Sequence, residues 1–141
     1  MASLDDQAVR DFLSAGTRTG KVAWVAADGA PHVAPIWFVL DGGDVVFNTG
    51  ADTGKGKALS REGRVSMVVD DEHPPYSFVK VDGTVTLSED LAEVRRLATV
   101  IGGRYMGEDR AEEFGARNGV PGELLVRLHP TRVTAAFDIA D

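Results

Sequence analysis

Two turns built on aspartate and glycine most constrain how this chain can fold, because they divide its first apolar stretch into short strands. The stretch KVAWVAADGAPHVAPIWFVLDGGDVVFNT (21–49) is rich in β-branched and aromatic residues, and it is interrupted at Asp28-Gly29 and at Asp41-Gly42-Gly43. Such turns connect antiparallel strands in β-hairpins. The pattern therefore predicts three antiparallel strands, at 21–27, 32–39 and 44–49.

The remainder of the chain adds strands and a few scattered helices. Strands are predicted at 64–71 and at 76–88, the second bent near Asp82-Gly83, and two more are predicted on either side of Pro130. These elements do not alternate as a βαβ sheet requires. The predicted fold class is mainly β (α+β), an antiparallel barrel of six to seven strands with peripheral helices. The helices, expected where apolar residues recur at helical spacing or helix formers gather, cover 4–13, 56–62, 89–102 and 109–117.

Length and composition favour one folded domain over residues 1–141. A chain of 141 residues can bury one hydrophobic core, and 43% hydrophobic with 26% charged residues is the usual balance of a globular protein. The apolar runs are only strand-sized, and the N-terminal segment lacks the basic and apolar regions of a secretory signal. We therefore expect no membrane association and a cytoplasmic location.

Charge and reactive residues exclude several classes of function. The formal net charge of −7 argues against a nucleic-acid partner, which needs a basic protein surface. There is no cysteine, and His32, His73 and His129 lie far apart without ligand spacing, so no metal site is expected. No Ser-His-Asp or paired-carboxylate arrangement stands out, which is consistent with redox chemistry carried by a bound cofactor.

The segment FNTGADTGKGKALSREGRVS (47–66) is the strongest candidate for a binding site. A strand that ends in Asn48-Thr49 passes through glycines into a helix, and the backbone N–H groups at the positive end of a helix can bind an anion. The glycines do not have the spacing of an NTPase phosphate loop. From residue types alone, a phosphate cradle and a glycine-shaped turn with solvated lysines both stay open. Hydroxyl groups and four of the fifteen basic residues gather here: Thr49, Thr53, Lys55, Lys57, Arg61 and Arg64.

Several segments together resemble one superfamily of cofactor-binding proteins. The hairpin strands, FNTGADTGKGKAL with the following RVS, and the later strand from Tyr76 resemble the split-barrel flavin-binding superfamily typified by pyridoxamine 5'-phosphate oxidase, over nearly the whole chain. More closely, PHVAPIWF, DDEHPPYSFV, RYMG and GELLVRLHPTRV resemble its actinobacterial branch of deazaflavin-dependent oxidoreductases, which use coenzyme F-420. The resemblance implies an FMN-binding type of split β-barrel.

The resemblance also implies which residues hold the phosphate of the cofactor. In the flavin enzymes a strand-end threonine, a small hydroxylic residue and a lysine do so, and these match Thr49, Thr53 and Lys55. The flavin enzymes usually have an arginine where this chain has Gly54. Because one charge pair to the phosphate is then missing, the deazaflavin is favoured over FMN.

Further cofactor contacts are predicted around this cradle. The strand residues Pro35, Ile36 and Trp37 match a strand that lies along the ring system in this superfamily, although Trp37 could equally belong to the core or to a subunit interface. Asn48, at the strand end, is included in the predicted cofactor site. From their charge, Lys57 and Arg61 are expected to extend the basic patch toward the anionic polyglutamate tail of coenzyme F-420.

Three more segments contain candidate functional residues. Tyr76 could lie at the mouth of the pocket or cap the barrel, and Arg104 could reach the cofactor of a partner subunit or lie in an exposed segment after a helix. The stretch Arg127-Leu128-His129 is superficially similar to the substrate-binding pair of pyridoxamine phosphate oxidases. That pair belongs to a C-terminal extension, so vitamin B6 oxidation is rejected and His129 is expected in a turn.

The resemblance implies an oxidoreductase that transfers hydride from reduced coenzyme F-420 to a small electron-poor organic acceptor. It also implies a C2 homodimer whose cofactor groove lies between the protomers. One alternative is an FMN-dependent oxidoreductase of the same fold. Another is a non-catalytic protein that binds a deazaflavin, haem or a lipid-like ligand. No catalytic residue and no proton donor is assigned.

Overall fold

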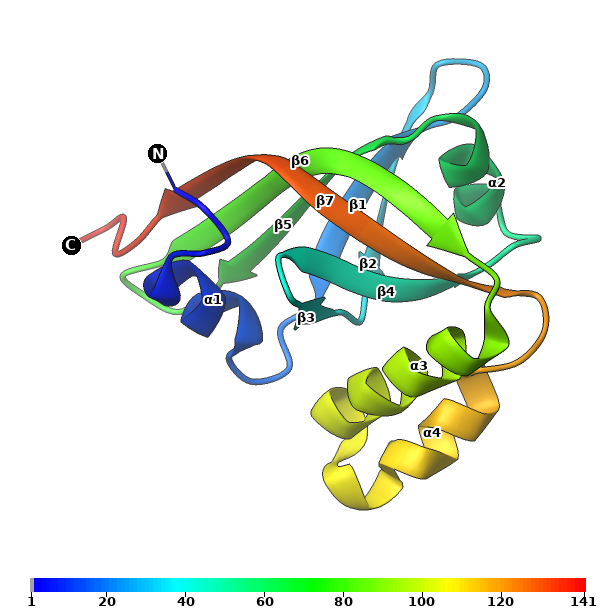
Figure 1. Cartoon of the computed structure of the whole chain (residues 1–141). Helices are drawn as coiled ribbons and strands as arrows, with labels where there is room; N and C mark the ends of the chain where they lie inside the picture. The colour runs from blue at the N-terminus through cyan, green and yellow to red at the C-terminus, as the bar shows by residue number, and fades with distance from the viewer. Residues whose placement is uncertain (1) are drawn as a thin grey trace.

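In the computed structural model, which describes residues 2–141, seven antiparallel strands form one sheet in the order β2-β1-β5-β6-β7-β4-β3. The sheet curls into a barrel with the helices outside it (Figure 1), which confirms the predicted α+β class and antiparallel barrel. The strand β5 has the predicted bounds. The strands are β1 (Gly20–Val25), β2 (Pro31–Ile36), β3 (Val39–Asp41), β4 (Asp44–Gly50), β5 (Arg64–Asp71), β6 (Ser77–Ser88) and β7 (Glu123–Ala136).

The helices cover three parts of the barrel surface. Helix α1 lies at the end where both termini emerge, α2 lies at the opposite end beside the tip of the β1–β2 hairpin, and α3 and α4 form a helical hairpin on one side (Figure 1). No helix among the described residues is long and apolar enough to cross a membrane. The helices are α1 (Gln7–Ser14), α2 (Gly54–Arg61), α3 (Leu91–Met106) and α4 (Ala111–Asn118), with a short 3-10 helix η1 (Glu108–Arg110) between the last two.

Strand β4 is buried on both of its faces, which explains its unbroken apolar run. Val45 and Phe47 belong to the main core inside the barrel, whereas Val46 belongs to a second cluster beneath α3. Successive side chains of a strand point to opposite faces, so each face of β4 meets its own apolar layer. This second layer holds the α3–α4 hairpin beside the end of β4, where the glycine-rich segment begins.

The C-terminal segment is one continuous strand, so the prediction of two strands separated by a turn at Pro130 is wrong. Pro130 pairs with Gly83 of β6 at a point where the register shifts. Proline has no N–H to donate, and irregular positions of a sheet accept it. A Cβ on Gly83 would lie 2.1 Å from the carbonyl oxygen of His129, so glycine is needed for this close approach. The predicted irregularity at Asp82-Gly83 therefore coincides with a shift of register between β6 and β7.

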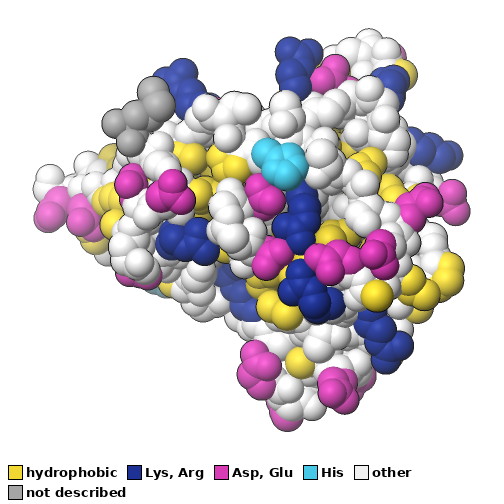
Figure 2. Space-filling model, in the orientation of Figure 1, with side chains coloured by type: hydrophobic (Ala, Val, Ile, Leu, Met, Phe, Trp, Pro, Cys, Tyr) yellow, Lys and Arg dark blue, Asp and Glu magenta, His cyan; other side chains and the backbone are white. Residues whose placement is uncertain are grey.

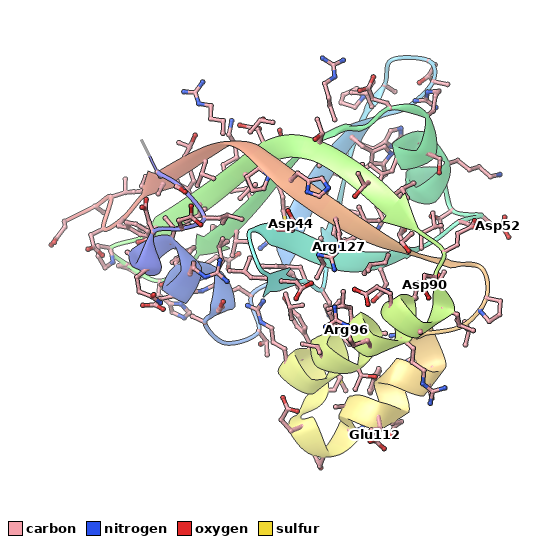
Figure 3. All side chains as sticks on the ribbon, viewed as in Figure 1. Asp44, Asp52, Asp90, Arg96, Glu112 and Arg127 are labelled. Carbon is pink, nitrogen blue, oxygen red and sulfur yellow. The ribbon has the colours of Figure 1, made fainter. Side chains whose placement is uncertain are left out.

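His129 is correspondingly part of β7 and not of a turn. Its Nδ1 lies 2.8 Å from Asp44, and its Nε2 lies 2.9 Å from the hydroxyl of Thr86. Arg127, two residues earlier, pairs with Asp41 at 2.8 Å and with Glu93 of α3 at 3.1 Å. These side chains belong to a charged network that gathers at the centre of the face in Figure 2, and Figure 3 shows Arg127 and Asp44 beside Arg96 of α3. The network joins the helical hairpin to the barrel.

Candidate functional site

The segment between β4 and α2 is organised by two threonine hydroxyl groups. Thr53 is the N-cap of α2, since its Oγ1 accepts from the N–H of Gly56 at 3.0 Å and donates to the carbonyl of Gly50 at 2.7 Å. Thr49 is buried, with 5% of its surface exposed, and its Oγ1 lies 3.5 Å from that of Thr53. The two hydroxyl groups therefore shape the loop, and backbone N–H groups are the donors left for a ligand.

Helix α2 starts in close contact with the end of β4. A Cβ on Gly56 would lie 2.2 Å from the carbonyl oxygen of Gly50, so only glycine permits this distance. The N–H groups of Gly54 and Lys55 precede the first bonded turn, and they have no acceptor within the part of the chain that the structure describes. Free N–H groups at a helix start carry partial positive charge and favour an anion.

A groove with a cavity volume of about 250 Å³ opens beside this helix start. It lies between the end of β4, the start of α2, the C-terminal parts of α3 and α4, and the end of β2 with the following Trp37. The groove brings together residues that are widely separated in the sequence. They are Pro35, Ile36, Trp37, Asn48, Lys55, Ile101, Asn118 and Glu123.

Lys55 and Glu123 are the charged groups that line the groove. Burial lowers the pKa of the Lys55 ammonium, and the attraction of Glu123 opposes this only in part. Burial likewise raises the pKa of the Glu123 carboxyl, and Lys55 opposes this in part. Among the described residues the two side chains form no ion pair, so the ammonium has lost water without gaining a carboxylate contact. A half-buried cation in this state favours an incoming anion.

Asn48 supplies a second unsatisfied donor in the same groove. Its Nδ2 is the buried side-chain nitrogen that has no hydrogen-bond partner among residues 2–141. A buried N–H group without a partner costs about 1–3 kcal/mol, so such groups in folded proteins commonly meet a ligand or water. Asn48 and Lys55 both line the groove, which therefore fits a ligand that carries an anionic group and further hydrogen-bond acceptors. A phosphorylated heterocyclic cofactor has both features.

Five of the predicted cofactor residues line this groove: Pro35, Ile36, Trp37, Asn48 and Lys55. The predicted residues Thr49, Thr53 and Gly54 form the adjoining turn, so the structure gathers the core of the predicted set at one place.

Lys57 and Arg61 extend from α2 away from the groove. Lys57 is exposed, and Arg61 donates to the carbonyl of Val25 at 2.9 Å. Arg61 lines a second, larger hollow of about 800 Å³ between the β1–β2 hairpin, α2, β5 and β6. Any contact from Arg61 to a ligand in the first groove would have to pass around α2.

Arg104 lies inside α3 and not after it. The glycines at 102 and 103 do not end the helix as predicted, because Gly102 packs against Phe114 of α4, where a Cβ would lie 2.5 Å from the Phe114 Cβ. The Arg104 guanidinium donates to backbone carbonyls of Leu13 at 2.7 Å and Phe38 at 2.8 Å. It therefore joins α3 to the end of α1 and has a structural role within this chain.

The two aromatic candidates differ in their surroundings. Trp37 stacks on Tyr105 of α3 with ring centroids 5.1 Å apart and planes 3° apart, while its edge still reaches the groove. Tyr76 lies in the β5–β6 turn with a φ of 64° and is exposed. This turn is at the α1 end of the barrel and α2 is at the other end (Figure 1), so Tyr76 can reach a cofactor site only in a partner subunit.

Sequence patterns did not identify Glu123, Asn118 and Ile101 as groove residues. Glu123 lines the groove because β7 pairs with β4 in a register that places Glu123 opposite Gly50. Ile101 and Asn118 line the groove because the helical hairpin of α3 and α4 packs on the sheet. Asn118 is the last residue of α4, and its position directly before Gly119 was the one local signal in the sequence that marked this end of the helix.

Comparison with known proteins identifies similar chains. A family model described as pyridoxamine 5'-phosphate oxidase matches residues 5–137. No curated protein matches the sequence. Among solved structures, a conserved hypothetical protein from Mycobacterium tuberculosis superposes with a TM-score of 0.80 and 24% identity, covering 92% of this chain and 83% of its own.

Two further structures with this fold differ in what their names say they bind. An F420 reductase superposes with a TM-score of 0.70 and 24% identity, over 88% of this chain and 94% of its own. A heme storage protein from Vibrio cholerae superposes with a TM-score of 0.73 and 17% identity, over 99% of this chain and 100% of its own. At these identities the structural likeness establishes the fold alone. The ligand has to be inferred from the residues of the groove.

Proposed function

Since this chain belongs to the pyridoxamine 5'-phosphate oxidase family, we propose that it is an oxidoreductase that binds the deazaflavin coenzyme F-420 in the groove beside α2. The observation that carries the proposal is the half-buried Lys55 ammonium, which has no ion-pair partner among the described residues and shares the groove with the unpaired Nδ2 of Asn48. In this proposal Lys55 and the free N–H groups of α2 hold the cofactor phosphate. Asn48 and the segment Pro35–Trp37, at and just after the end of β2, contact its ring system.

The chemistry that the deazaflavin supplies when bound is hydride transfer to an electron-poor organic acceptor. This chain contributes binding, orientation and exclusion of water. The backbone from Pro35 to Trp37 is held in place by the stacking of Trp37 on Tyr105, which provides a rigid edge against which a flat ring can be oriented. The substrate is a small molecule of the quinone, enone, nitroaromatic or tetrapyrrole type, to be distinguished by turnover assays.

Haem storage is the less favoured alternative. Haem iron is usually held by a His, Cys, Met or Tyr side chain, and none of the described residues that line the groove is of these types. His129 is bonded to Asp44 and Thr86 on the outside of the barrel, at 2.8 and 2.9 Å.

The test is a fluorescence titration of the purified chain with coenzyme F-420 and with FMN at moderate salt. Submicromolar to low-micromolar binding of coenzyme F-420 supports the proposal. Stoichiometric FMN that remains bound through purification would contradict it and would establish the flavin alternative.

Gly54→Arg is expected to raise the affinity for FMN about tenfold and to change the affinity for coenzyme F-420 less than threefold, because it supplies a cation that can pair with the doubly charged phosphate of FMN. A side chain fits at this position, since a Cβ on Gly54 would have no atom within 4 Å. The same titrations measure the effect, and Gly54→Ala is the control for the added side chain. Unchanged FMN affinity would mean that position 54 does not face the phosphate.

We also propose that a second copy of this chain completes the groove. A volume of about 250 Å³ is small for a cofactor, since pockets for such ligands usually have about 300–1,000 Å³. On the outward face of the β1–β2 hairpin, Val25 and Val33 are 46% and 67% exposed. Ala23 pairs with Val33 and lies on that same face, so the hairpin presents an apolar surface of the kind that interfaces cover.

Val33→Asp is accordingly expected to shift the protein from dimer to monomer and to weaken binding of coenzyme F-420 about tenfold, because a carboxylate would be desolvated in the interface. Sedimentation velocity measures the first effect and fluorescence titration the second. Val100→Asp, at a similarly exposed position on α3, is the matched control and should alter neither. A native chain that sediments as a monomer would refute the shared groove.

A further inference from the structure

Glu123 places a carboxylate inside the cradle that the proposed function assigns to a phosphate. It lies opposite Gly50 in the β4–β7 ladder. A Cβ placed on Gly50 would lie 3.2 Å from the Oε2 of Glu123 and also 3.2 Å from the Cγ2 of Thr53. The carboxylate thus reaches the turn at the start of α2, where the N–H groups of Gly54 and Lys55 have no acceptor among residues 2–141.

Among the described residues that line the groove, one carries a charge opposite to that of Glu123. Lys55 of α2 faces it across the groove, whereas Asn48 of β4, Ile101 of α3 and Asn118 of α4 are uncharged. The described lining of the groove therefore carries one cation and one carboxyl group. An anion that enters meets both of them.

We propose that Glu123 limits the anion held in this cradle to a single negative charge, as in a phosphodiester, and makes its binding proton-linked. This inference rests on the proposed function and specifies the chemical class of phosphate that the site accepts. With Glu123 protonated, the Lys55 charge neutralises one negative charge of the ligand. A phosphomonoester, which carries close to two charges at neutral pH, leaves an uncompensated charge in a partly dehydrated groove.

The direction of the proton linkage follows from the same contacts. Burial already raises the pKa of the Glu123 carboxyl in the free protein. A bound anion a few ångströms away raises this pKa further, because it repels the ionised form. Between the pKa values of the free and the loaded groove, binding takes up a proton, so the affinity falls as the pH rises through that window.

Coenzyme F-420 and FMN are suitable probes, because the first carries its phosphate as a diester and the second as a monoester. Repulsion between two charges is proportional to their product. Removing the Glu123 charge should therefore help the monoester more than the diester. At pH 8 we expect Glu123→Gln to bind coenzyme F-420 about threefold more tightly and FMN about tenfold more tightly than the native chain.

The experiment is isothermal titration calorimetry of the native chain, Glu123→Gln and the control Glu112→Gln, in two buffers of different ionisation enthalpy. Glu112 is exposed on α4, and Figure 3 shows it far from Asp52, which lies in the cradle turn. We expect the native chain and the control to take up the same number of protons per bound coenzyme F-420, and Glu123→Gln to take up fewer, by as much as one.

The outcomes separate this inference from the proposed function. Tight binding of coenzyme F-420 with equal proton uptake by the native chain and Glu123→Gln overturns the inference and leaves the proposed function standing. An equal gain of affinity for both cofactors in Glu123→Gln also overturns it. If the native chain binds no coenzyme F-420, the proposed function fails, and the inference fails with it.

Discussion

Lys55→Ala is expected to bind coenzyme F-420 about 30-fold more weakly than the native chain, a loss of about 2 kcal/mol, because a charge-assisted hydrogen bond in a partly dehydrated groove is removed. Lys55 is the cation that lines the groove in the described structure, so no neighbouring ammonium or guanidinium can replace it there. The effect is measured by fluorescence titration at a fixed, moderate salt concentration. The exposed Lys57 is the matched comparison, and Lys57→Ala should weaken binding at most threefold.

The loss of binding should not result from unfolding. Burial lowers the pKa of Lys55, which means that the folded protein disfavours its charged form, and this penalty applies at every pH below the lowered pKa. Replacing the ammonium therefore relieves a cost in the native state. Lys55→Met, which keeps the apolar stem, should have a free energy of unfolding within about 1 kcal/mol of the native value in urea denaturation. Equal affinity of the native chain and Lys55→Ala would exclude Lys55 from the site.

Gly56→Ala is expected to lower the free energy of unfolding by about 2–3 kcal/mol and the Tm by about 5–10 °C, because the new Cβ cannot be accommodated without moving α2. The Cβ would lie 2.2 Å from the carbonyl oxygen of Gly50 and 3.2 Å from the Cα of Ala51, both of them backbone atoms. Displacing α2 also moves the free N–H groups, so coenzyme F-420 binding should weaken in the same variant. Thermal denaturation and titration measure the two effects.

Gly54→Ala is the matched control for this second prediction. Its Cβ would point into open space, and the exchange replaces glycine by a better helix former at the first position of α2. Its stability should equal or exceed that of the native chain by up to about 1 kcal/mol. If Gly56→Ala proves as stable as Gly54→Ala, the close contact between α2 and β4 is not as described.

The strands and helices could be predicted largely from local pattern. Strand β5 has the predicted bounds, and the turns at Asp28-Gly29 and Gly42-Gly43 lie between paired strands as expected, whereas the predicted strand 32–39 is divided into β2 and β3 at Trp37-Phe38. The continuous strand β7 could not be predicted, because Pro130 is tolerated only by virtue of Gly83 on the neighbouring strand. The continuation of α3 past Gly102 was missed for a similar reason. Because Gly102 has no side chain, Phe114 of α4 can pack closely against α3 at this point.

The residues of the candidate site also form two groups, one that could be predicted from the sequence and one that could not. Thr49, Thr53, Gly54 and Lys55 are close in sequence, so their common location follows from one strand end and one helix start. Glu123 and Asn118 are distant in sequence, and only sheet register and helix packing place them on the same groove. No periodicity in the chain indicates that a carboxylate enters the cradle.

By itself, the sequence determined most strands and helices of this protein and the position of the glycine-rich turn before α2, because hairpin turns, alternation and helix caps depend on neighbouring residues. The tertiary structure alone decided that, among residues 2–141, Lys55 loses water without gaining a salt bridge and the Nδ2 of Asn48 is left unpaired, and that Glu123 lies beside Gly50. These properties depend on burial and on distances between side chains. Both arise only when segments remote in the chain pack together, which is why the proposed charge selectivity of the groove depends on the fold and not on any single motif.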